Sequence, residues 1–202
     1  SAFFPLFAAV GPLWPCEGDR LHRESGTLSP LLASGLEVWY SDGACTSALA
    51  LPGLPAVGSW AIQGMGLARV AWVSSTKVTP LLTEFLPLQW LLTTRPSTAW
   101  VRLHTDCAEL VSVWKRVRAL LQEPDVPGLA LGSVLAGLGA LPLGSSLLSL
   151  WQEGTLTAAS CARFDLVWAS HRRPTATPEI RENLQLAHDL ATAHNRRHPA
   201  RR

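Results

Sequence analysis

The most restrictive feature of the sequence is a hairpin followed by helical and strand-like segments in alternation. Two apolar segments meet at Gly66, which favours a tight turn between antiparallel strands. Further short apolar segments lie upstream and downstream of this hairpin, bounded by turn-forming residues. The predicted strands are Leu36–Tyr40, Val57–Met65, Leu67–Ser74, Trp100–His104 and Phe164–Ser170.

Between and after these strands, apolar residues recur at helical spacing. The first helical segment begins at Pro80 with Thr79 as its N-cap, and Pro87 inside it predicts a kink. Further helices are predicted at Glu109–Leu121, Ser145–Gln152 and Pro178–Asn195. A mixed sheet that starts with a hairpin and carries packed helices is an α/β domain.

The composition is that of one folded domain with less regular ends. Hydrophobic residues make up 48% of the 202 residues and charged residues only 16%, which excludes a disordered chain. Residues 1–35 contain Pro, Gly and short apolar runs without a starting Met, so we expect a linker or arm that follows a preceding polyprotein domain. The domain is predicted over residues 36–195, and a basic tail over residues 196–202.

Two further features bear on metals and membranes. The four cysteines lie too far apart in sequence for a zinc site built on paired cysteines, and a reduced, intracellular protein is expected. Val126–Trp151 has no charged residue and is long enough to span a bilayer. Its several glycines and prolines favour a buried loop and helix instead, so no membrane partner is expected.

Three acids stand where an active site on such a sheet forms. Asp42 ends the first predicted strand, Glu84 lies in the first turns of the first helix, and Asp106 ends the fourth strand. Strand ends and helix starts converge on one edge of the sheet, so these acids are expected to meet there. Clustered carboxylates repel one another unless a metal ion neutralises them. Taken singly, each acid has an ordinary structural explanation, and the hypothesis depends on their order and context together.

Four segments of the chain resemble the ribonuclease H family, most closely the retroelement type attached to reverse transcriptases. The matching segments are Trp39–Ala44 with its Asp-Gly, Thr83–Leu86, Val101–Cys107, and Val167–His171 continued by Pro178–Asn183 and Ala187–Ala191. The resemblance covers roughly residues 36–195. It implies a ribonuclease H-like mixed five-stranded sheet, with three antiparallel strands and then parallel strands, and with helices on both faces.

The resemblance also implies site residues. Asp42, Glu84 and Asp106 correspond to the family's metal carboxylates, which hold two Mg²⁺ ions, with Mn²⁺ as a substitute. His171 corresponds to a loop histidine that helps product release or proton movement.

The fourth carboxylate of the family is uncertain in this sequence. Strict alignment places His188 at that position, and Asp189 is one residue later. Neighbouring positions on a helix point about 100° apart, so both side chains cannot face a metal equally. We expect Asp189 to supply the carboxylate chemistry, while His188 remains a candidate ligand or general base.

Basic residues supply candidate contacts to nucleic acid. Lys115, Arg116 and Arg118 lie on the second predicted helix, and Arg172 and Arg173 follow the last strand. An ordinary charged helix face gives the same pattern on the helix. Residues 171–202 as a whole hold seven arginines and three acids, which favours a polyanionic partner as well as a solvated terminus.

Three functions follow from these features. The first is a metal-dependent endonuclease that hydrolyses the RNA strand of RNA/DNA hybrids, as the ribonuclease H domain of a retroelement polyprotein that includes a reverse transcriptase domain. Such a domain would act in the cytoplasm, the nucleus or a retroelement particle. The second is an inactive, connection-type scaffold domain, favoured by the altered fourth position, Pro87 and the uncharged stretch. The third is another nuclease or transposase of this fold, with Glu179 or Glu182 as the closing acid.

Overall fold

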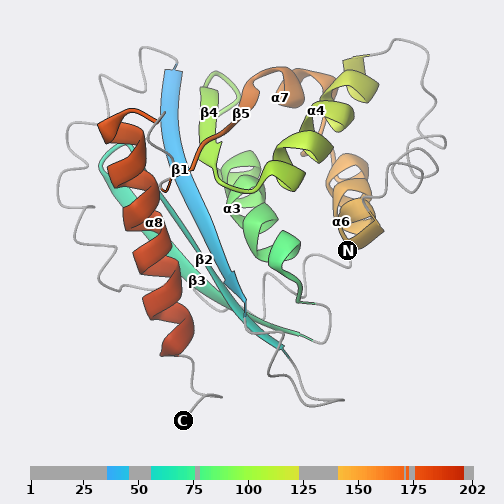
Figure 1. The fold of residues 1–202 in the computed structure, drawn as a ribbon. Helices are drawn as coiled ribbons and strands as arrows, with labels where there is room; N and C mark the ends of the chain where they lie inside the picture. The colour runs from blue at the N-terminus through green and yellow to red at the C-terminus, as the bar shows by residue number, and fades with distance from the viewer. Residues whose placement is uncertain are drawn as a thin grey trace.

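The computed structural model describes residues 36–45, 56–75, 78–122, 141–170, 172 and 176–197 (Figure 1). The predicted arm at residues 1–35 and most of the predicted basic tail lie outside these residues, as does the first part of the uncharged stretch. The strands are β1 (Leu36–Cys45), β2 (Ala56–Gly64), β3 (Leu67–Ser75), β4 (Trp100–Thr105) and β5 (Phe164–Trp168). The helices are α3 (Pro80–Thr94), α4 (Ala108–Gln122), α6 (Leu141–Gln152), α7 (Ala158–Ala162) and α8 (Pro178–Arg196).

The five strands form one mixed sheet in the order β3-β2-β1-β4-β5. The pairs β1–β2 and β2–β3 are antiparallel, whereas β1–β4 and β4–β5 are parallel. Helix α8 covers one face, and α3, α4, α6 and α7 lie on the other side (Figure 1). The prediction of a mixed five-stranded sheet, with three antiparallel strands, then parallel strands, and helices on both faces, is confirmed.

The hairpin between β2 and β3 turns at Met65 and Gly66, as predicted from the glycine. Both residues have positive φ, 55° and 74°. A two-residue turn of this kind has the twist that antiparallel strands require, so it fixes the register of the whole hairpin. Gly64 pairs with Leu67 next to the turn and Ala56 with Ser75 at the far end.

Helix α3 is the central helix, and it begins as the sequence predicted. The Thr79 side chain accepts a hydrogen bond from Leu82 N at 3.1 Å, and Pro80 occupies the first turn. The helix continues through Pro87 to Thr94. Its residues are buried almost all the way round, which is typical of a helix enclosed by other elements.

The aromatic residues account for much of the core. Trp39, Trp60 and Trp114 are fully buried or nearly so, and Trp39 packs edge-on against Trp90 at 5.7 Å between ring centroids. Trp114 Nε1 donates to the Phe164 carbonyl at 3.0 Å, which satisfies its buried polar atom and ties α4 to β5. The sheet and the helices α3 and α4 are thereby held around one core.

Several predicted boundaries are wrong because tertiary pairing extends or ends the elements. Strand β1 continues to Cys45, since Ser41 to Cys45 all pair with β2, so Asp42 lies inside the strand and not at its end. Helix α6 begins at Leu141 and not at Ser145, and β5 ends at Trp168. Helix α7 was not predicted, although Thr157 and Ser160 form a capping box at its start. No helix among the described residues is long and apolar enough to cross a membrane.

A buried ion pair joins the start of β1 to the end of α3. Glu37 is 0% exposed, and Arg95 Nε and Nη2 donate to its two carboxylate oxygens at 2.7 and 2.8 Å. Trp39 Nε1 donates to the same carboxylate at 3.0 Å, and the Arg95 guanidinium lies over the Trp39 ring. The charge of Glu37 is therefore compensated entirely by groups of this chain.

We expect Arg95→Met to lower the free energy of unfolding by about 3–5 kcal/mol, because it leaves the Glu37 carboxylate buried without its cation. Urea denaturation measures the loss. The matched control is Arg102→Met, which breaks the half-exposed pair with Asp165 at 3.4 Å. Its expected loss is below about 1 kcal/mol. Equal losses in the two variants would contradict a stabilising role for the buried pair.

Candidate metal centre

Asp42 lies in the central strand, beside the place where α3 packs most closely on the sheet. Its side chain is almost fully buried. The next residue, Gly43, has no side chain, and a Cβ placed there would lie 2.5 Å from Thr83 Oγ1 and 2.7 Å from the Thr83 carbonyl carbon. A Cβ on Gly58 of the neighbouring strand would lie 2.6 Å from Thr83 Cγ2. Because the two glycines have no side chains, they leave the space that Thr83 occupies.

This packing brings Glu84, the residue after Thr83, to the side of Asp42. Glu84 Oε1 accepts a hydrogen bond from Gly43 N at 3.2 Å. Its other oxygen, Oε2, is buried and accepts a hydrogen bond from no donor among the described residues. A buried carboxylate oxygen without a partner is costly, so this atom favours a cation at this position.

Asp106 completes the cluster from the end of β4. The chain turns there, with Cys107 N donating to Thr105 Oγ1 at 3.2 Å and Trp168 Nε1 donating to the Asp106 carbonyl at 3.1 Å. One carboxylate oxygen each from Asp42, Glu84 and Asp106 lie within 4.8 Å of one another. The three acids that the sequence singled out are therefore brought together.

The electrostatics of the cluster match a site for a hard divalent cation. Burial raises the pKa of Glu84 well above its ordinary value, and the charges of Asp42 and Asp106 raise it further. Burial also raises the pKa of the neighbouring Cys107 thiol to about 11, so the thiol stays protonated at neutral pH and is a poor ligand. The donor set is then carboxylate oxygen, which Mg²⁺ and Mn²⁺ prefer.

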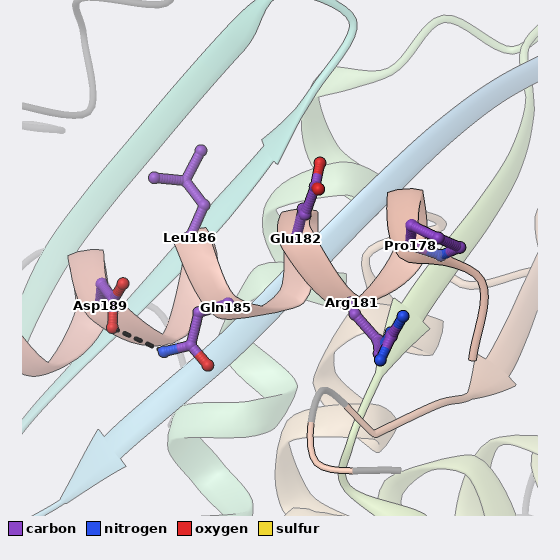
Figure 2. A pocket seen from close by; sticks show the side chains of 6 residues that line it. All are labelled: Pro178, Arg181, Glu182, Gln185, Leu186 and Asp189. Atoms are coloured by element: carbon purple, nitrogen blue, oxygen red, sulfur yellow. Dashed lines mark hydrogen bonds between the residues drawn. The ribbon is translucent and has the colours of Figure 1, made fainter. Parts of the chain in front are cut away.

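Helix α8 places His188, and not Asp189, against the acidic cluster. His188 Nδ1 lies 2.6 Å from Asp42 Oδ2. Asp189 is exposed on the outer side of α8, where it accepts a hydrogen bond from Gln185 Nε2 at 2.8 Å (Figure 2). Among the described residues, the structure thus does not place Asp189 with the three carboxylates, because one residue turns the side chain by about 100° around the helix.

The outer side of α8 has a shallow hollow of its own. Its lining residues, shown in Figure 2, are Pro178, Arg181, Glu182, Gln185, Leu186 and Asp189. Glu182 and Asp189 are both exposed, and Asp189 is turned toward Gln185 in this view. Glu179, the other acid considered for a different nuclease type, is exposed at the start of the same helix. Of these acids, none belongs to the cluster that the described residues form around Asp42.

The remaining predicted site residues are His171 and the basic residues, and those that the structure describes lie in different environments. His171 and Arg173 lie outside the described residues. Lys115 and Arg116 are exposed on α4, and Arg172 is exposed after β5. Arg118 instead contacts the protein, donating to the Ala162 carbonyl at 3.2 Å and lying 3.8 Å from Asp165.

Two features of the site were not inferred from the sequence. One is the contact between His188 and Asp42, for which no local pattern exists because the residues are 146 positions apart. The other is the close packing of Thr83 against Gly43 and Gly58. A glycine inside a strand indicates close approach of another backbone, so Gly43 and Gly58 carried a usable signal.

No family model and no curated protein matches the chain. Among solved structures, one match is LC11-RNase H1, isolated from compost by a metagenomic approach. It is 12% identical with a TM-score of 0.42, and the match covers 80% of this chain and 96% of that chain. At this similarity the match assigns neither family nor activity.

We expect Gly43→Ala to destabilise the protein by about 1–3 kcal/mol, because the new methyl group must push α3 away from β1. The same displacement separates Glu84 from Asp42 and weakens divalent-ion binding. Chemical denaturation and calorimetric titration with Mg²⁺ measure the two effects. Gly144→Ala in α6 is the control, since its Cβ would meet nothing within 4 Å. In this variant the free energy of unfolding should rise by about 0.5–1 kcal/mol, because alanine is more stable than glycine inside a helix. Similar behaviour of both variants would refute the packing explanation.

We expect Glu84→Gln to stabilise the metal-free protein at neutral pH. The pKa of Glu84 is raised in the folded state, so folding binds this proton more tightly than the unfolded chain does. Stability is therefore lost as pH rises from the ordinary value of 4.5 toward the raised value, and the glutamine removes that loss. Thermal unfolding in chelator across this range measures it. A constant difference between wild type and variant at every pH would contradict the assignment.

Proposed function

We propose that the chain is a metal-dependent nuclease of the ribonuclease H type, which hydrolyses the RNA strand of RNA/DNA hybrids. The observation that carries the proposal is the cluster of Asp42, Glu84 and Asp106, in which Asp42 is buried and the other two are partly buried, beside the paired strands β1 and β4. Its geometry supports a metal site more than an ordinary acidic surface, since Asp42 is nearly buried and no donor among the described residues reaches Glu84 Oε2.

Asp42, Glu84 and Asp106 would hold Mg²⁺, as a pair of ions according to the family resemblance, with Mn²⁺ as a substitute. Bound Mg²⁺ supplies charge for a phosphodiester oxygen and lowers the pKa of a coordinated water. Asp42 in β1, Glu84 in α3 and Asp106 directly after β4 would supply these carboxylates from three different elements of the fold. Donors held by packed elements in this way limit the reorganisation needed on binding.

The proposed substrate follows from the resemblance and from exposed basic residues. Lys115 and Arg116 on α4, with Arg172 after β5, are exposed and suited to contact phosphates. Discrimination of an RNA strand would use its 2′-hydroxyls in the minor groove of the hybrid. We further propose that the domain belongs to a retroelement polyprotein with a reverse transcriptase domain, and that it acts inside the cell.

The test is cleavage of a labelled RNA/DNA hybrid with Mg²⁺ or Mn²⁺. Asp106→Asn should reduce cleavage by about 100-fold or more, since removal of a ligand costs at least as much as removal of its supporting groups. Asp165→Asn is the control, because Asp165 lies in β5, half-exposed beside Arg102. It should cut at the wild-type rate. A folded wild-type protein that cuts no hybrid with either metal would refute the nuclease and favour the inactive scaffold.

A further inference from the structure

The contact between His188 and Asp42 is the closest polar contact that the described structure gives to the acidic cluster from outside it. His188 Nδ1 lies 2.6 Å from Asp42 Oδ2. The Asp42 side chain is 7% exposed and that of His188 is 35% exposed. The hydrogen bond therefore lies at the edge of the site, with the carboxylate inside and the imidazole reaching solvent.

The chemistry of the pair assigns the donor. An ionised carboxylate only accepts hydrogen bonds, so a hydrogen bond from His188 to an ionised Asp42 requires the tautomer with its proton on Nδ1. In a neutral imidazole, a proton on Nδ1 leaves Nε2 as the acceptor, and Nδ1 then has no lone pair for a metal ion. His188 in this tautomer holds one oxygen of Asp42 through Nδ1, which a metal ion cannot then use.

The packing of α8 fixes where this imidazole lies. On both sides of His188, groups of the sheet donate to helix carbonyls. Gln63 Nε2 donates to Asn183 O at 3.1 Å, and Trp72 Nε1 donates to His194 O at 2.6 Å. Ser59 Oγ also donates to Ala191 O. The helix is therefore anchored to β2 and β3 over several turns, and His188 faces Asp42 as a consequence of that anchoring.

The metal-ligand group itself does not extend to His188. Among the described residues, the atoms that approach one another within 4.8 Å come from Asp42, Glu84 and Asp106. We propose that His188 is a positioning residue, which donates Nδ1–H to Asp42 and holds its carboxylate toward Glu84 and Asp106. This inference rests on the proposed metal-dependent function. In place of the fourth carboxylate that the family resemblance implies, it gives a hydrogen-bond donor that acts through Asp42.

The test uses the whole chain and measures Mg²⁺ binding by calorimetry, independently of cleavage. His188→Ala should weaken Mg²⁺ by about 10–100-fold, the usual cost of losing a group that orients a ligand. His188→Asn should restore most of the affinity, because the asparagine amide reaches the position of ring Nδ1 and still donates. Gln185→Ala, on the outer side of the same helix, is the control and should bind like wild type.

A second measurement reads the hydrogen bond directly in the metal-free protein. Long-range ¹H–¹⁵N correlation should show a proton on Nδ1 of His188, identified by the loss of its signals in His188→Asn. An Nε2–H tautomer would overturn the proposal, as would unchanged Mg²⁺ affinity in His188→Ala. An asparagine variant as weak as the alanine variant would also overturn it, since that pattern belongs to direct ligation through the ring.

The two hypotheses fail in different ways. If the folded wild type binds no Mg²⁺, the proposed function fails, and the positioning role fails with it. If the wild type binds Mg²⁺ but the histidine variants do not follow the predicted order, only the role of His188 is refuted.

Discussion

The close approach of α3 to the sheet is the constraint on which the site depends. Thr83 sits between Gly43 and Gly58, and a methyl group on either glycine would occupy the space of that side chain. The approach lets Gly43 N donate to Glu84, so the same glycine both admits the helix and binds its carboxylate. The site is therefore a product of backbone packing first and of side-chain chemistry second.

Strand β1 carries two buried acids, and the groups that surround their carboxylates differ. Glu37 has Arg95 and Trp39 as partners, so its charge is neutralised within the chain. Asp42 has a histidine on one side and a like-charged acid on the other. The ion pair of Glu37 supports folding. The arrangement around Asp42 instead favours binding of a cation from outside the protein. A single strand thus separates the structural acid from the functional one.

The fold was largely predictable because its signals are local. The turn at Gly66, the cap at Thr79 and the alternation of strand and helix patterns each concern neighbouring residues. The mixed five-stranded sheet was implied by the family resemblance, and the meeting of Asp42, Glu84 and Asp106 by the convergence of strand ends and helix starts on one edge of the sheet. The exact end of β1 was not predictable, because Ser41 to Cys45 are held in the strand by pairing with β2.

The fourth site position required tertiary information. Sequence reasoning left His188 and Asp189 as alternatives and favoured Asp189, whereas the rotation of α8 selects His188. That rotation is set by Ser59, Gln63 and Trp72 on the sheet, which no local pattern links to the helix.

The position of α8 in the chain also determines when its part of the site is synthesised. The three carboxylates are all synthesised by residue 106, but the histidine that orients Asp42 belongs to the last helix. During translation, the three carboxylates therefore precede the helix that carries His188. A chain that is interrupted before α8 lacks both the cover over β2 and β3 and the imidazole, so under the proposed role of His188 its metal affinity would be reduced.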